Sequence, residues 1–190
     1  MDHTTEGASD AASPDRGLGF SPGLRGLLEP RDEEAGPSLT DLSAEEQLGG
    51  FIAKFTPEIA TRTRAVLAKM QSLLPGSFEL VYDNYNALVV GFGPTDRASD
   101  ALFSIAVYPR WISLFFLHGS GLSDPAHLLQ GSGKSVRHIV LNQAENLDLP
   151  PVRTLMGQAL KRSSKPLDPM QPRRIVVKSI ATKQRARRPT

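Results

Sequence analysis

The sequence predicts an α+β fold, a two-layer sandwich of about three helices on a five- to six-stranded, mainly antiparallel sheet. Apolar residues recur at helical spacing in two segments before residue 75 and in one segment after residue 150. Between them lie short runs of β-branched and aromatic residues, separated by Gly, Pro and Asp. An order of helix, helix, strands and helix is typical of this kind of sandwich.

Two helices are expected before the strands. Ser43 and Glu46 have the spacing of a capping box, which predicts a helix start at this point. Thr56 followed by Pro57 predicts the start of a second helix, which should end at Pro75 and Gly76. The apolar face of the second helix consists of Ile59, Val66, Leu67, Met70 and Leu73.

The central region predicts five strands. Pro109 and Arg110 form a very short connection, so the two strands that flank it should make an antiparallel hairpin. The expected strands cover residues 78–82, 87–92, 102–108, 111–117 and 136–141.

A third helix and a further edge strand are expected after these strands. Residues 151–162 carry apolar side chains on one helical face, with Asp148 near the start. Three prolines make residues 163–172 a linker, and Ile175, Val176, Val177 and Ile180 then predict an edge strand within 174–180.

Charge divides the chain into three parts. Residues 1–39 carry a net charge of −5 and lack a periodic apolar pattern, which predicts a disordered acidic arm. Residues 40–162 hold the α+β domain, and residues 163–190 form the linker and a basic tail; the net charge is −2 for residues 40–160 and +9 for residues 161–190. The absence of cysteine excludes disulfides and thiolate chemistry, and no apolar run is long enough to cross a membrane. We therefore expect a soluble, cytoplasmic protein.

The segment from Leu128 to Leu141 contains Gly-Ser-Gly-Lys but does not have the spacing of a phosphate-binding loop. A Walker A loop needs a glycine five residues before its Gly-Lys pair and a helix after it. Here that position is Leu128, and a strand is expected after Ser135. We expect Lys134 to lie on a tight glycine turn that binds neither ATP nor GTP.

Several segments together resemble the YdhG-like domain of unknown function. They are the helix with Pro57 and Glu58, the strand around Val81 and Tyr82, the hairpin at Trp111, the segment LLQGSGKSVRHIVL and the helix LPPVRTLM. The resemblance covers roughly residues 45–162 and implies a small bacterial α+β domain with no established enzymatic activity. Some relatives are described as frataxin-like iron-binding proteins, which makes iron binding a further hypothesis, with Glu79 and Asp83 as the carboxylates to test.

Aromatic side chains indicate a candidate ligand site. Strand 111–117 is apolar on both faces, and helices can cover only one face of a two-layer sandwich. The second face then needs core packing, a second subunit, the Ile175 segment or a ligand groove. The candidate ligand-binding residues are Tyr82, Tyr85, Tyr108, Trp111, Lys134, Arg137 and His138. The preferred hypothesis is a non-enzymatic domain that binds a small ligand or protein partner through the sheet face or the Lys134 loop, with a homodimer as an alternative.

The basic tail favours a rival hypothesis, an accessory protein that binds nucleic acid weakly and without sequence preference. The cations expected to be free for phosphates are Lys183, Arg185, Arg187 and Arg188. We assign no catalytic residue, cofactor or metal ligand, because the four histidines lack the spacing of a metal site and no serine lies in a G-x-S-x-G elbow.

Overall fold

We describe the protein from a computed structural model, which describes residues 42–188. The predicted acidic arm, residues 1–39, lies outside the described residues. The helices are α1 (Ala44–Ala53), α2 (Pro57–Leu73) and α3 (Pro150–Arg162). The strands are β1 (Phe78–Asp83), β2 (Leu88–Gly93), β3 (Phe103–Val107), β4 (Ile112–Phe116), β5 (Arg137–Leu141) and β6 (Arg174–Ile180). Every helix and strand expected from the sequence is present in this region, with ends shifted by one or two residues.

The first two helices begin at the residues that the capping patterns predict. At α1, the Ser43 hydroxyl accepts a hydrogen bond from the Glu46 N–H (3.2 Å), and the Glu46 carboxylate accepts one from the Ser43 N–H (2.8 Å). The Ser43 hydroxyl also donates to that carboxylate, and these bonds to Ser43 lower the pKa of Glu46. At α2, the Thr56 hydroxyl accepts from the Ile59 N–H, with Pro57 in the first turn.

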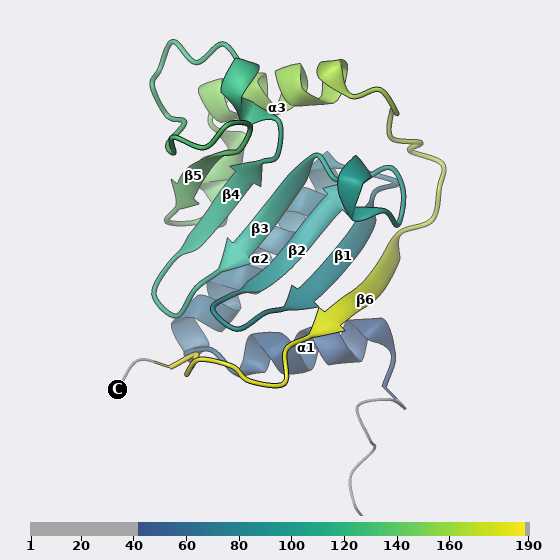
Figure 1. Cartoon of the computed structure of the whole chain (residues 1–190), viewed down its shortest axis with the longest axis vertical. Coiled ribbons are helices and arrows are strands. Elements are labelled where there is room, and N and C mark those ends of the chain that lie inside the picture. Colours follow the sequence, from purple (N-terminus) through teal and green to yellow (C-terminus); the bar gives the residue numbers. More distant parts are fainter. Residues whose placement is uncertain (1–41, 189–190) are drawn as a thin grey trace, which may run out of the picture. The chain divides into compact units, whose positions relative to one another are not determined.

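The strands form one sheet in the order β5-β4-β3-β2-β1-β6 (Figure 1). All neighbouring pairs are antiparallel except β1 and β6, which are parallel. The expected α+β sandwich and the expected edge strand at 174–180 are therefore confirmed. The parallel pairing follows from the linker, which leads from α3 to the far edge of the sheet before β6 begins (Figure 1).

The linker between α3 and β6 passes very close to Gly76, which lies between α2 and β1. Gly76 has a φ of 75°, and a Cβ at this position would lie 1.7 Å from the Asp168 carbonyl oxygen. The side-chain amide of Gln171 also donates to the Gly76 carbonyl at 3.1 Å. Only glycine allows this close crossing, which brings the chain to the edge where β6 pairs with β1.

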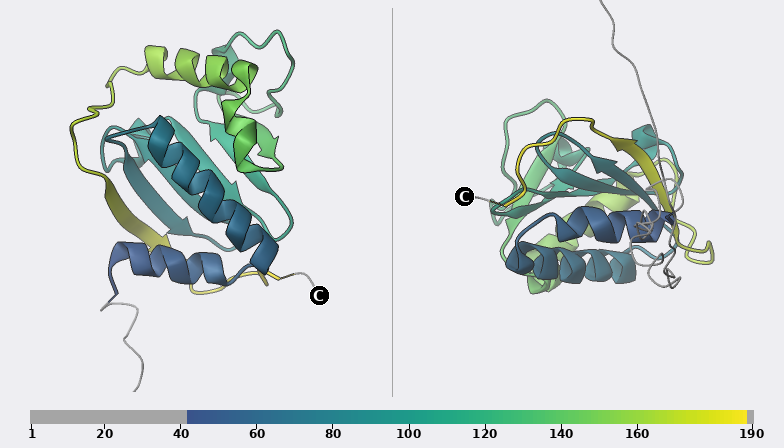
Figure 2. Two further views of the ribbon diagram at one scale, coloured as in Figure 1. Left: turned by 180° about the vertical axis from the view of Figure 1, so that it is seen from behind. Right: turned by 90° about the horizontal axis from the view of Figure 1, so that it is seen from below.

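All three helices cover the same face of the sheet, and the core lies between these layers (Figure 2). Alternate strand residues point into it, and the inward positions of the central strands are fully buried. The fully buried strand residues of this layer include Val81, Leu88, Val90, Phe92, Phe103, Ile105, Val107, Ile112, Leu114 and Phe116. Burial of each such side chain contributes about 1.5–3 kcal/mol, so this layer dominates the stability of the fold.

No α-helix of the described residues covers the second face of the sheet, the face toward the viewer in Figure 1. Part of it is covered by the loop between β2 and β3, whose Ala101 packs against Gly91 and Gly93. The Ile175 segment, one of the alternatives expected to cover this face, extends the edge of the sheet and does not lie over the face. Ile175 and Val177 lie in the edge strand and pack against the helix-side core instead.

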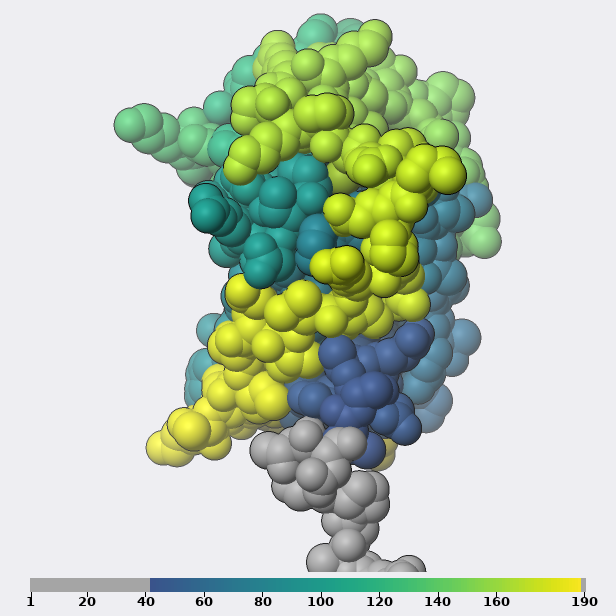
Figure 3. Space-filling view, turned by 90° about the vertical axis from the view of Figure 1, so that its right-hand side faces the viewer, coloured from purple at the N-terminus to yellow at the C-terminus, as the bar shows by residue number. Residues whose placement is uncertain are grey.

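Residues 181–188 follow β6 and run across the lower end of the sheet (Figure 1). Figure 3 shows β6 and the residues near it, in yellow, directly beside α1, in blue. We call residues 181–188 the tail. Of the helices that the structure describes, none is long and apolar enough to span a membrane.

Candidate functional site: an aromatic and basic groove

A buried carboxylate anchors the tail. Asp83 is the last residue of β1, and its side chain has no exposed surface. It accepts hydrogen bonds from Lys54 Nζ at 2.6 Å, Gln184 Nε2 at 2.7 Å and Arg187 Nη2 at 2.9 Å. The Arg187 side chain is 3% exposed, and its guanidinium lies 5.4 Å from the centroid of the Phe55 ring. Two cations therefore form ion pairs with Asp83, one from the end of α1 and one from the tail.

Backbone contacts hold the tail along its length. The Ala181 N–H donates to the Asp83 carbonyl and the Arg185 N–H donates to the Tyr85 carbonyl, both at 2.9 Å. The Arg188 guanidinium donates to the carbonyls of Ala53 (3.1 Å) and Phe55 (3.2 Å), at the C-terminal end of α1. A cation is favourable at this end of a helix because it satisfies carbonyls that have no partner within the helix.

The expectation that Arg187 stays free for phosphates is wrong. An ionised carboxylate without a counterion is costly inside a protein, and Arg187 fills this role for Asp83. The alternation of β1 indicates that Asp83 needs a counterion, because Glu79, Val81 and Asp83 share the inward face, but it does not indicate which cation supplies it. Glu79, the other acid on this face, is also paired with an arginine. It forms an ion pair with Arg173, and the hydrogen bond to Glu79 raises the pKa of Arg173.

The tail forms one wall of a groove. The groove has a volume of about 530 Å³ and lies between the β1–β2 turn, the β3–β4 turn and the tail. It is lined by Asn86, Tyr108, Pro109, Arg110, Trp111, Arg185, Ala186 and Arg188. We call it the hairpin groove.

The β3–β4 hairpin presents a stacked aromatic pair in this groove. The Tyr108 N–H donates to the Trp111 carbonyl at 2.9 Å, which closes the turn through Pro109 and Arg110. The Tyr108 and Trp111 rings stack with centroids 4.8 Å apart and an angle of 21°. Trp111 is 45% exposed, so part of its surface is open to a ligand. Tyr85, 52% exposed, lies in the neighbouring turn next to the lining residue Asn86.

The charge of the hairpin groove is positive. Its lining includes the side chains of Arg110, Arg185 and Arg188, and these described lining residues include no Asp or Glu. Guanidinium groups bind phosphates and carboxylates through paired hydrogen bonds, and aromatic rings stack on planar groups. The groove can therefore hold a ligand that is both planar and anionic.

The candidate ligand-binding residues do not form one site. Tyr108 and Trp111 line the hairpin groove, whereas Arg137 pairs with Phe116 at the opposite end of β4 from Ile112. The Arg137 guanidinium bonds to carbonyls of its own loop, next to the exposed Lys134.

The remaining two candidates lie in the sheet. His138 stacks on Phe115, with ring centroids 5.1 Å apart. Tyr82 is half-buried in β1, and its hydroxyl is buried without a hydrogen-bond partner among the described residues. These side chains are too widely placed to contact one small ligand together with Trp111.

The residues that sequence analysis missed belong to the turns. The sequence pattern indicates Arg110 only as a turn residue, and it gives no indication of Asn86. Arg110 lies between Tyr108 and Trp111 in a very short turn, and this position indicates a role, because such a turn brings its side chain close to both rings. By contrast, no local pattern places Arg185 and Arg188 next to Trp111.

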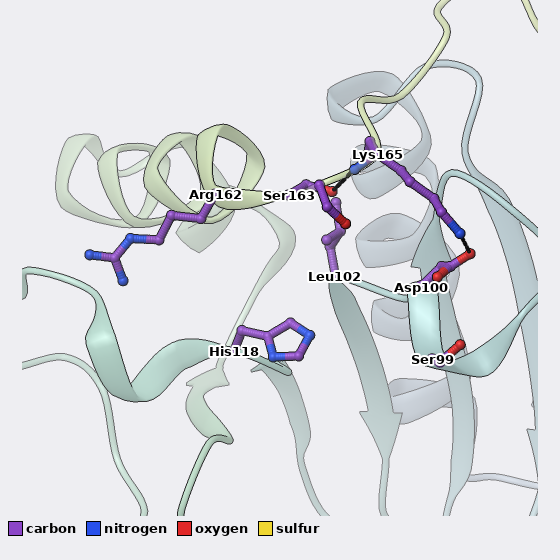
Figure 4. Close-up of a pocket in the computed structure, with 8 residues that line it drawn as sticks. Ser99, Asp100, Leu102, His118, Arg162, Ser163 and Lys165 are labelled. Carbon is purple, nitrogen blue, oxygen red and sulfur yellow. Dashed lines mark hydrogen bonds and ion pairs between the residues drawn. The ribbon is translucent and has the colours of Figure 1, made fainter.

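A second, smaller cavity of about 240 Å³ lies between α3 and the ends of β3 and β4 (Figure 4). Asp100 accepts hydrogen bonds from Lys165 Nζ and the Thr95 hydroxyl, both at 2.7 Å, and the pKa of Asp100 is lowered by Lys165 first and by Thr95 second. The Arg162 side chain extends away from His118 (Figure 4) and packs beside Gly121. Asp100, the acid that lines this cavity, is already paired with Lys165, which makes the cavity a weaker candidate than the hairpin groove.

Metal binding has no obvious centre in residues 42–188, where no cluster of three or more His, Cys, Asp or Glu side chains could hold an ion. Glu79 and Asp83, the carboxylates proposed for iron, are buried in ion pairs with arginines.

Comparisons with models of known families, with curated proteins and with solved structures found no match to this chain. The resemblance to the YdhG-like domain therefore stays a prediction.

Proposed function

We propose that this protein is a non-enzymatic binding domain whose ligand carries an aromatic ring and a phosphate group and binds in the hairpin groove. The observation that supports this most strongly is the exposed Trp111 ring beside three arginines in a groove of about 530 Å³. The proposal keeps the binding function expected from the sequence. It moves the site from the Lys134 loop to the hairpin, and it joins the aromatic candidates to the basic tail.

The aromatic part of the ligand follows from Trp111. This ring is already ordered by stacking on Tyr108, so a second planar group can stack on it with little loss of side-chain freedom. Stacking of a base on an aromatic side chain contributes about 1–3 kcal/mol. An aliphatic ligand would lack this stacking on the Trp111 ring.

The phosphate follows from the arginines. Arg110 and Arg185 are exposed and have no ion pair with a described carboxylate, and Arg188 uses part of its guanidinium on the carbonyls of Ala53 and Phe55. Charge-assisted hydrogen bonds from guanidinium to phosphate are among the strongest in proteins. A nucleotide unit has both the ring and the phosphate.

The lining also favours binding over catalysis. The side chains that line the groove are amide, aromatic, alkyl and guanidinium groups. General acid–base catalysis near neutral pH most often uses imidazole or carboxyl groups, and covalent catalysis uses an activated nucleophile. The one phenol among the described lining residues, Tyr108, is stacked on Trp111. The groove residues suit recognition of charge and shape.

Trp111 is the single tryptophan of the chain, which makes its fluorescence a probe of this groove. We expect AMP to quench Trp111 with a saturable curve, and Arg185→Gln to weaken the binding by about tenfold or more, because it removes a charge-assisted contact. Lys134→Gln is the matched control, since it removes a cation at the opposite end of the sheet and should leave the curve unchanged. Unsaturable quenching, or equal binding by the wild type and Arg185→Gln, contradicts the proposal.

A further inference from the structure

We infer that the natural ligand of the hairpin groove is a single-stranded nucleic acid, of which the groove holds one nucleotide and the surface around it holds the next. This inference rests on the proposed function and names the class of ligand. Three observations support it. They are the number of free cations at this end of the sheet, the second exposed aromatic ring, and the anchoring of the tail beside the β1–β2 and β3–β4 turns.

The cations exceed what one nucleotide needs. Seven cations lie between Arg173 and Arg188 in the sequence. Arg173 and Arg187 are engaged with Glu79 and Asp83, so carboxylates already balance their charges. Lys183 and Arg185 are exposed and have no ion pair with a described carboxylate.

With Arg110 and Arg188, this end of the sheet presents about four cations to a ligand. A terminal phosphate carries a charge of about −1.5 to −2, whereas each linking phosphate of a strand carries −1. A strand of about three or four nucleotides with a 5′-terminal phosphate carries about −4 to −5 and therefore balances this charge, whereas a mononucleotide balances only half of it.

A second aromatic ring supports a chain of bases. Tyr85 is 52% exposed in the β1–β2 turn, and Trp111 is 45% exposed in the β3–β4 turn. Successive bases of a single strand stack on aromatic side chains in this manner, with cations along the backbone. In a duplex the bases are stacked on each other, so these rings would contact no base face. The two exposed rings thus favour a single strand.

The anchored tail keeps the cations and the rings on one surface. The hydrogen bond from the Arg185 N–H to the Tyr85 carbonyl places the tail beside the first turn. Ala186 and Arg188 then line the groove against Trp111 and Arg110 in the second turn. Arg185 and Arg188 therefore lie close to both aromatic turns, as an ordered path for a strand requires.

The test compares AMP with single-stranded adenine oligonucleotides of increasing length, up to about eight nucleotides, by Trp111 fluorescence. We expect the affinity to rise by about tenfold or more between AMP and four nucleotides and then to level off. For the longer strands, the slope of log affinity against log salt should approach about −3, from roughly 0.7 per phosphate for four contacts.

Two variants test the path of the strand. Lys183→Gln should reduce the salt slope by about 0.7, because it removes one phosphate contact. Tyr85→Ala should weaken the four-nucleotide strand by about tenfold and leave AMP unchanged, since only a longer ligand reaches the second turn. Arg174→Gln, which removes a β6 cation that lies over Phe78, is the matched control and should change neither slope nor affinity.

The outcomes separate this inference from the proposed function. If AMP binds at Trp111 but longer strands bind no more tightly, the inference is overturned and the proposed function stands. If neither AMP nor the strands alter Trp111, the proposed function itself fails. Duplex DNA that binds as tightly as a single strand, or strand binding that is unchanged by Tyr85→Ala and Lys183→Gln, also overturns the inference.

Discussion

At the scale of single residues, Asp83 and Arg187 decide where the tail lies. Both side chains are buried, and Lys54 and Gln184 complete the contacts of the carboxylate. Burial of two charges costs solvation, which their mutual attraction and hydrogen bonds must offset. The pair therefore fixes the position of the tail more than it adds to the net free energy of unfolding. Loss of Asp83 would leave Arg187 buried without a counterion, whereas loss of Arg187 would leave Asp83 with Lys54 and Gln184.

This argument predicts unequal effects of neighbouring arginines. Arg187→Ala should lower the free energy of unfolding by about 3 kcal/mol, because it leaves Asp83 with Lys54 as its remaining cation. Arg185→Ala, at an exposed position, should change it by about 0.5 kcal/mol or less. Urea unfolding of the two variants measures the difference, and equal stabilities would contradict the buried pair.

At the scale of elements, α1 holds the tail at one end and has a capping box at the other. Lys54, its C-cap residue, contacts Asp83, and the carbonyls of Ala53 and Phe55 accept from Arg188. Gly49 and Gly50 lie in the middle of this short helix and lower its intrinsic helix propensity. The helix therefore depends on its cap and on its packing.

The cap of α1 should make stability depend on pH. Hydrogen bonds from Ser43 lower the pKa of Glu46 in the folded protein relative to the unfolded chain. The contribution of the cap is therefore complete above the ordinary pKa of a glutamate, about 4.3, and is lost as the pH falls through the lower folded pKa. Ser43→Ala should lower the unfolding midpoint at pH 7, and the gap to the wild type should narrow at about pH 3. A gap that stays constant with pH would show that Glu46 does not take part.

At the scale of the whole molecule, the sequence predicts the helices and strands well. It predicts poorly which distant segments contact one another. Capping boxes, prolines and apolar alternation act within a few residues, and they place α1, α2 and the β3–β4 hairpin correctly. Asp83 and Arg187 are 104 residues apart in the chain, so no local pattern could pair them. The hairpin groove exists because such distant contacts fold the tail onto the β-turns.

Removal of the tail tests this dependence on distant contacts. A chain that ends at Ile180 keeps all of β6 and loses Gln184, Arg185, Arg187 and Arg188. We expect it to fold with its sheet intact, and we expect acrylamide to quench Trp111 more strongly because one wall of the groove is gone. Circular dichroism checks the fold, and an unchanged quenching constant in a folded chain would show that the tail does not form that wall.

The most direct test of the central claim, that a phosphate-bearing aromatic ligand binds in the hairpin groove, is the indole N–H signal of Trp111 in a nitrogen–proton NMR spectrum during addition of AMP. The chain has one tryptophan, so this signal needs no assignment. We predict a saturable shift of the Trp111 signal, accompanied by shifts of Arg110 and Arg185. A spectrum in which Trp111 stays still while residues around Lys134 and Arg137 shift would contradict the account and place the ligand at the opposite end of the sheet.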